Sequence, residues 1–281
     1  MNRTRLYFVC TFLLCWVNLQ LNFAQVSLAP TALFIPDQTN VASLFVNNNS
    51  LQPQEITVSF EFAYPGSDDQ GNMITISKDS INASRHGLTA NLRVFPRQFT
   101  LQPGKQQTVR VQVRPMQGKP DGVYWTRVIV SSQSASKDID TIKVTDGIGT
   151  KINYVFSQNI PAFYVKGKVT TGLTPGMVTT SFEKNKLIAI TKLTPTGNAP
   201  YNGSVTARLL NPAGKEIARQ YQTVVAYFEV LRRVEFALPA EPPAPGKYTL
   251  EFLYETKRAD ISPTDLVQAA PVKYNVPVEI K

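Results

Sequence analysis

The sequence predicts an all-β protein built from two β-sandwich domains. Apolar and polar residues alternate along short stretches such as Ile56 to Phe62 and Tyr248 to Tyr254, as in strands with one buried face. Turn-forming residues separate these stretches, and the chain contains 20 Pro and 15 Gly. Beyond the first 24 residues, no stretch of helical length shows a period of about 3.6 residues. A length of 281 residues suits two domains of roughly 100 to 150 residues each.

Residues 1–24 have the three parts of a secretory signal peptide. Arg3 and Arg5 precede an apolar run from Leu6 to Val17, and the segment ends at the small residue Ala24. We expect cleavage after Ala24 and export of the remaining chain. The apolar run is shorter than the roughly 20 residues that span a bilayer, and no comparable run follows. We therefore expect no stable membrane insertion after cleavage.

The first domain is predicted over residues 25–168. The regular stretch Phe99 to Arg114 is expected to be a hairpin that turns at Pro103-Gly104, and Tyr64 to Asn72 is expected to be a loop. The other strands of this domain are expected at Val26 to Leu33, Val41 to Val46, Ile56 to Phe62, Met73 to Ile76, Leu92 to Phe95, Val123 to Val130, Ile139 to Val144 and Lys151 to Val165.

The second domain is predicted over residues 169–281. It follows a segment rich in Thr, Gly and Pro, Thr170 to Pro175, which is typical of a connection between domains. Its strands are expected near Phe182 and at Leu187 to Thr191, Val205 to Leu210, Val224 to Val230, Val234 to Leu238, Tyr248 to Tyr254 and Val272 to Ile280.

The stretch from Lys151 to Val165 combines two patterns. Its first half alternates, so that Ile152, Tyr154 and Phe156 form an apolar row on one side of an extended strand. Its second half is more continuously apolar and contains Pro161, which cannot donate to a ladder and belongs at an edge or a strand transition. The pattern predicts either a domain's closing strand or a docking surface.

The motifs of common enzymes are missing from the sequence. There is no Gly-x-Ser-x-Gly, no phosphate-binding glycine loop and no His-Glu-x-x-His, and both cysteines, Cys10 and Cys15, lie in the predicted signal peptide. The single histidine, His86, is expected to be a surface loop residue. The net charge of +9 comes from scattered Lys and Arg, which favours a solvated basic surface over a nucleic-acid site. We expect no catalysis, cofactor, metal or nucleic acid.

Five segments in a fixed order resemble a known family. VSLAPTALFIP, ASLFVNNN, RVFPRQFTLQPGKQQTVRV, VYWTRVIV and NIPAFYVKG, followed by a second β-domain, are similar to the periplasmic pilus chaperones of the PapD-like family. The resemblance covers Val26 to about Lys168, and the second domain matches by size and class. It implies two immunoglobulin-like domains in a boomerang arrangement, a periplasmic location and a role in pilus assembly.

The family resemblance also implies a binding mode and its partners. In donor-strand complementation, the chaperone lends an edge strand to an exported pilus or fibre subunit, and an outer-membrane usher can be a further partner. The lending strand here would be Lys151 to Phe163. Its client contacts would be Ile152, Tyr154, Phe156 and Ile160.

One part of the family pattern is missing. Members hold the subunit's terminal carboxylate with two basic residues, and the matching positions here are Ala32 and Asn159. Lys151, Lys166 or Lys168 would have to substitute for them as basic anchors. The alternative function is a non-catalytic structural or adhesive β-sandwich component of a cell-envelope assembly, and a hydrolase on a sandwich scaffold is a more distant one.

Overall fold

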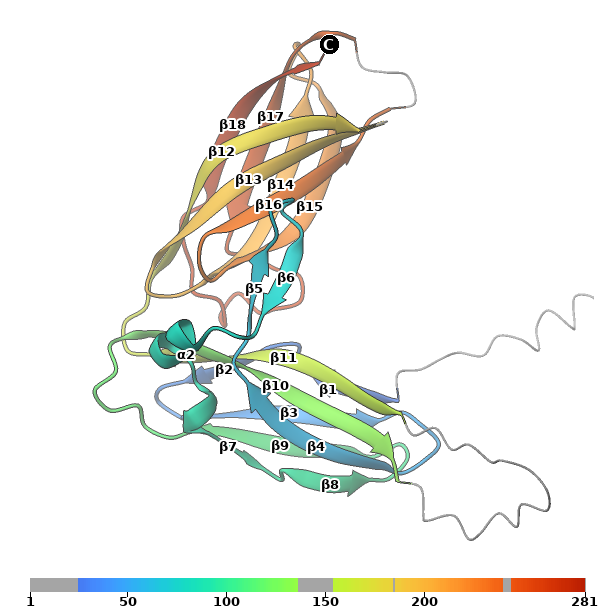
Figure 1. The fold of residues 1–281 in the computed structure, drawn as a ribbon, viewed down its shortest axis with the longest axis vertical. Helices are drawn as coiled ribbons and strands as arrows, with labels where there is room; N and C mark the ends of the chain where they lie inside the picture. Colours follow the sequence, from blue (N-terminus) through green and yellow to red (C-terminus); the bar gives the residue numbers. More distant parts are fainter. Residues whose placement is uncertain (1–24, 136–153, 184, 240–243, 281) are drawn as a thin grey trace, which may run out of the picture.

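A computed structural model describes residues 25–135, 154–183, 185–239 and 244–280. The described chain is almost entirely β, and its strands form two sandwiches that meet at an angle, with a small hairpin rising from the first alongside the second (Figure 1). The prediction of an all-β fold with two sandwiches is confirmed.

The first sandwich packs a four-stranded sheet against a five-stranded one. The smaller sheet has the order β1-β3-β9-β7, with β1 (Val26–Ala29), β3 (Val41–Asn48), β9 (Gln106–Val113) and β7 (Leu92–Phe95). The larger sheet has the order β2-β11-β10-β4-β8, with β2 (Leu33–Pro36), β11 (Val155–Lys166), β10 (Gly122–Ser134), β4 (Gln54–Glu61) and β8 (Gln98–Leu101). The inward rows of both sheets form one core, including Val109, Val111, Val128, Ile35 and Tyr164.

The second sandwich has a three-stranded and a four-stranded sheet. The first has the order β12-β13-β16, with β12 (Thr171–Glu183), β13 (Lys186–Gly197) and β16 (Val230–Ala237). The second has the order β15-β14-β17-β18, with β15 (Glu216–Ala226), β14 (Tyr201–Leu210), β17 (Gly246–Glu255) and β18 (Val272–Ile280). Its core includes Leu187, Ala207, Phe236, Leu250 and Phe252.

A hairpin and a short helix leave the first sandwich toward the second. The hairpin pairs β5 (Tyr64–Ser67) with β6 (Met73–Ile76), and the helix α2 (Ser80–His86) follows it. The main chain of β16 donates two hydrogen bonds to the hairpin: Leu231 N to Ser67 Oγ at 2.8 Å and Arg233 N to Gly71 O at 3.2 Å. The hairpin therefore lies along the outer edge of β16 (Figure 1).

Aromatic residues from both sandwiches form a third apolar cluster between them. Trp125 lies near its centre and contacts Tyr227 of the second sandwich, with ring centroids 4.8 Å apart. Phe163 stacks on Phe34 at 5.1 Å and on Tyr227 at 6.1 Å. The buried members of this cluster are Ala32, Phe62, Tyr64, Val123, Trp125, Phe163, Ala199, Tyr227, Ile261 and Leu266.

Several predicted elements are wrong in detail. The stretch from Phe99 to Arg114 turns as expected but is not a hairpin, because β8 pairs with β4 and β9 pairs with β3 and β7 in the opposite sheet. Tyr64–Ser67 is a strand and not part of a loop. Thr171 to Pro175 belongs to β12. The predicted strand Val224 to Val230 is divided between β15 and β16.

The first predicted strand, Val26 to Leu33, also divides between two elements. β1 pairs with β3, whereas β2 runs parallel to β11 in the other sheet. A segment containing Pro30 connects them, and its missing amide proton explains why neither ladder continues through this point. The predicted strand Ile139 to Val144 lies outside the described residues.

Candidate functional site

The strand β11 is paired differently on its two sides. On one side β10 pairs with it antiparallel along its whole described length, from Val155 opposite Gln133 to Lys166 opposite Gly122. On the other side β2 pairs only with Ala162 to Val165. Among the described residues, no strand pairs with the outer edge of Val155 to Pro161. Alternate backbone groups of this half-strand are thus left without a ladder partner in the described part of the chain.

The side chains of β11 change from exposed to buried along the strand. Ile160, Ala162 and Tyr164 point into the first core. The same row continues outward through Phe156 and Tyr154, because alternate residues of a strand share a face. Phe156 is 47% exposed and Tyr154 is 65% exposed, and their ring centroids are 6.4 Å apart. An apolar pair thus extends the core-facing row beyond the end of the core.

Gln158 marks the point where the core ends. Its side-chain Nε2 donates to the carbonyl of Val26 in β1 at 2.6 Å, so it bridges the two sheets at the open side of the sandwich. Ile160, next along the row, is 7% exposed and packs inside the core. The exposed part of the predicted client row is therefore Tyr154 and Phe156. Lys151 and Ile152 lie outside the described residues.

Two of the three predicted basic anchors, Lys166 and Lys168, lie at the other end of β11. Lys166 forms an ion pair with Asp121, with Nζ and Oδ1 3.6 Å apart. The backbone N–H of Lys168 donates to Oδ2 of the same carboxylate at 3.0 Å, and the Lys168 side chain is exposed. Ala32 is buried between the sandwiches, whereas Asn159 is exposed on β11. The carboxylate of Asp121 therefore contacts both Lys166 and the backbone of Lys168 at the end of β11. The ammonium group of Lys166 is thus already ion-paired.

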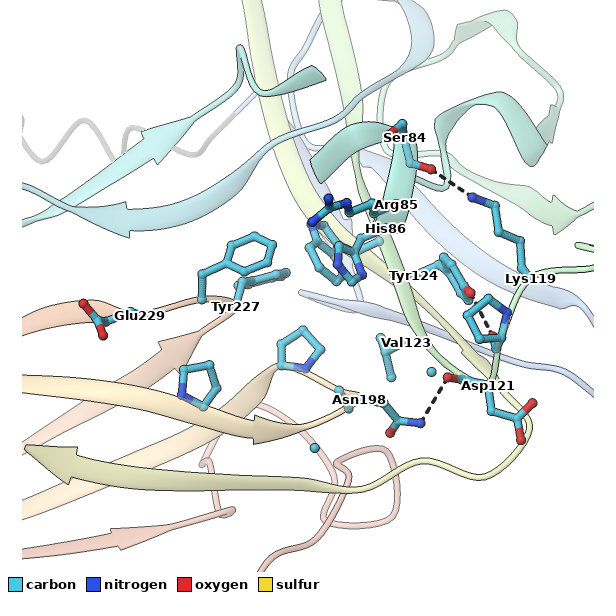
Figure 2. Close-up of a pocket in the computed structure, with 18 of the residues that line it drawn as sticks. Ser84, Arg85, His86, Lys119, Asp121, Val123, Tyr124, Asn198, Tyr227 and Glu229 are labelled. Carbon is cyan, nitrogen blue, oxygen red and sulfur yellow. Dashed lines mark hydrogen bonds between the residues drawn. The ribbon is translucent and has the colours of Figure 1, made fainter. Parts of the chain in front are cut away.

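The junction contains a second feature, which the sequence did not predict. A cavity of about 850 Å³ lies between the end of α2, the Lys119–Trp125 segment and two turns of the second sandwich. Figure 2 shows residues that line it. His86 lines it and stacks on Trp125, with ring centroids 4.8 Å apart and an interplanar angle of 13°. The prediction of His86 as a surface loop residue is wrong, since it is the half-buried last residue of α2. Burial, together with the charges of Arg85 and Lys119, lowers the pKa of His86 below its usual 6.5.

No group of three or more His, Cys, Asp or Glu side chains is arranged to hold a metal ion within the described ranges. The described helices include none long and apolar enough to cross a bilayer.

Comparisons with known proteins give matches only among solved structures. No known family model matches the chain, and no curated protein sequence matches it. The YadV chaperone structure matches with a TM-score of 0.46 and 9% identity, covering 91% of this chain and 100% of that one. The SafB chaperone of Salmonella enterica, in complex with the SafA pilin, matches with a TM-score of 0.42 and 16% identity, covering 91% and 98%.

A third structure is a chaperone bound to a tip subunit. The CsuC–CsuE pre-assembly complex of Acinetobacter baumannii matches with a TM-score of 0.44 and 10% identity, covering 89% of this chain and 98% of that one. By its own strand pairing, this chain is a two-domain β-sandwich protein with an incompletely paired strand, β11, next to the junction between its domains.

Proposed function

We propose that this chain is a periplasmic chaperone-like protein that binds an exported, β-rich pilus or fibre subunit by lending it the outer edge of β11. The observation that carries the proposal is the edge of Val155 to Pro161, which no described strand pairs with, next to the exposed rings of Tyr154 and Phe156. A client strand could add to this edge through main-chain hydrogen bonds, while the two rings enter the client's apolar core. The family resemblance in the sequence supports the same reading.

The composition of the edge supports strand addition. Val155 to Pro161 contains no charged residue. Proteins usually protect an exposed edge with charged side chains, bulges or a covering segment. Burying two aromatic rings in a client would contribute roughly 1.5 to 3 kcal/mol each before ordering costs. The absence of basic residues at Ala32 and Asn159 implies that the edge and its apolar row contribute more of the affinity than a carboxylate anchor does.

The test is co-expression with candidate fibre subunits, followed by purification of the complex. We expect the double substitution Tyr154→Asp and Phe156→Asp to reduce the recovered client at least tenfold, because it places two charges in a buried interface. The matched control replaces two exposed aromatic residues of other strands, Phe95→Asp and Phe182→Asp, which are 77% and 45% exposed. The control variant should retain the client.

Three outcomes would count against the proposal. Equal client recovery for the two double variants would show that β11 is not the lending strand. Absence of any complex with fibre subunits would remove the proposed client class. Stable copurification with an envelope complex at fixed stoichiometry would favour a structural component instead.

A further inference from the structure

The junction cavity is separate from the open edge of β11. Its walls come from the end of α2, the start of β10 and the turns of the second sandwich around Asn198 and Phe228 (Figure 2). No residue of β11 lines it. Its volume of about 850 Å³ lies within the range of roughly 300 to 1,000 Å³ that small-molecule sites occupy.

Part of the wall is aromatic and apolar. Trp125, Tyr227 and Phe228 line the cavity, and Trp125 contacts both of the other rings. Val123 and Pro200 extend this surface. His86 lies flat against Trp125 and edge-on to Phe228 at 5.7 Å. This surface suits an apolar or aromatic body.

The charged side chains that line the cavity differ in whether they have an ion-pair partner. Its two carboxylates are both paired with lysines: Asp121 with Lys166 at 3.6 Å, and Glu229 with Lys192 at 2.9 Å. The two cationic side chains that line the cavity are those of Arg85 and Lys119. In the described part of the chain, neither Arg85 nor Lys119 has a carboxylate within 4.0 Å.

Lys119 is nevertheless held in place. Its Nζ donates to the carbonyl of Ser84 at 2.8 Å, which fixes the ammonium beside the end of α2 (Figure 2). An ammonium group has three donors, so two remain for other acceptors. The lowered pKa of His86, caused first by burial and then by Arg85 and Lys119, agrees with an uncompensated positive field in the cavity.

The wall also contains a donor that the fold does not use. Trp125 is 2% exposed, and its indole Nε1 has no hydrogen-bond partner among the described atoms. A buried N–H without an acceptor destabilises the folded state, so most proteins satisfy such groups. An acceptor oxygen supplied by a ligand would satisfy this one.

We propose that the junction cavity binds a small amphipathic anion, a carboxylate carried on an apolar or aromatic body. The carboxylate lies between Arg85 and Lys119, and the apolar body packs on the aromatic wall, where His86 and Phe228 are the partly exposed rings. This proposal does not depend on strand lending by β11, since the two sites share no residue.

The test uses three probes with the same body and different charge: 3-phenylpropionate, 3-phenylpropanamide and 3-phenylpropylamine. Binding is followed through tryptophan fluorescence of the exported chain. Trp125 reports on the cavity directly, because the only other tryptophan, Trp16, lies in the predicted signal peptide. We expect the carboxylate to bind at least tenfold more tightly than the amide, and the amine to bind most weakly.

Two charge variants make the test specific. The double substitution Arg85→Gln and Lys119→Gln should remove the advantage of the carboxylate over the amide. The control, Arg93→Gln and Arg110→Gln, removes two exposed cations from the outer face of the first sandwich and should leave that advantage unchanged. Equal affinities for the three probes, no fluorescence change with any of them, or a carboxylate advantage that survives the first double substitution would each overturn the proposal.

Discussion

The strands β16 and β11 each have an edge that their own sheet leaves unpaired, and among the described residues only the edge of β16 is covered by another part of the chain. The edge of β16 is covered by the β5–β6 hairpin of the other sandwich, through Ser67 and Gly71. The outer edge of Val155 to Pro161 in β11 has no such cover among the described residues. The covered strand carries Arg232, Arg233 and Glu235, whereas the uncovered segment carries no charge.

The two edges differ in how they are protected against pairing with another chain. Charged side chains alone would discourage β16 from pairing with other chains, yet a hairpin also covers it. In the described part of the chain, the neutral, partly apolar edge of β11 has neither protection. A free strand with these properties is suited to pairing with a strand from another polypeptide.

The largest expected effect separates the two halves of β11. Phe163→Ala should lower the free energy of unfolding by about 3 to 5 kcal/mol, because it leaves a cavity among Phe34, Trp125 and Tyr227 in the junction cluster. Phe156→Ala should change it by about 0.5 kcal/mol or less, because this ring is 47% exposed. Urea unfolding of both variants measures the difference. Similar losses would show that the outer half of β11 is as important for the fold as the inner half.

A smaller effect tests the covered edge. Gly71 has a φ of +73°, and a Cβ there would lie 2.9 Å from the backbone N of Arg233. Gly71→Val should therefore strain the hairpin by roughly 1 to 3 kcal/mol and separate it from β16. Hydrogen exchange at the amides of Leu231 and Arg233 should become faster.

The control for this prediction is Gly104→Val. This residue also has a positive φ, +67°, but a Cβ there has nothing within 4 Å. It shares the backbone strain without the contact to β16, so exchange at Leu231 and Arg233 should stay slow. Faster exchange at these amides in both variants, or in neither, would show that the hairpin is not what protects the edge of β16.

The sequence predicts the strands better than their partners. Alternation identifies Ile56 to Phe62 and Tyr248 to Tyr254 as half-buried strands because side-chain direction is a local property. Pairing is not local: the turn at Pro103-Gly104 connects strands of opposite sheets, and no residue near it shows this. Likewise, β2 and β11 are neighbours although about 120 residues separate them in the chain.

The two candidate sites also differ in how far the sequence predicts them. The apolar row of Tyr154 and Phe156 can be read from the alternation, and the structure adds which edge is open. The junction cavity has no pattern in the sequence, because its walls come from four separate segments. His86 illustrates this: its neighbours Ser84, Arg85 and Gly87 suggest a loop, and only the contact with Trp125 shows its place.

The smallest expected effect is the lowering of the pKa of His86. It tests whether water is excluded from the junction, in contrast to the exposed edge of β11. Because burial and two nearby cations lower its pKa, the folded chain binds a proton less readily than the unfolded chain, whose value is near 6.5. Its contribution to stability is therefore complete above pH 6.5 and is lost as the pH falls from there through the lower folded pKa. As the only histidine, it gives a single imidazole signal by NMR in a chain without a histidine tag.

The midpoint of that signal should lie below 6.5 and should rise when Arg85→Gln and Lys119→Gln remove the neighbouring charges. High salt should raise it less in the double variant than in the unchanged chain, because salt screens only charges that are present. A depression of the pKa that remains in the double variant is then due to burial, which is the largest cause of the shift. A midpoint at 6.5 or above in the unchanged chain would mean that water reaches His86 freely, and the junction would then be as open as the edge of β11.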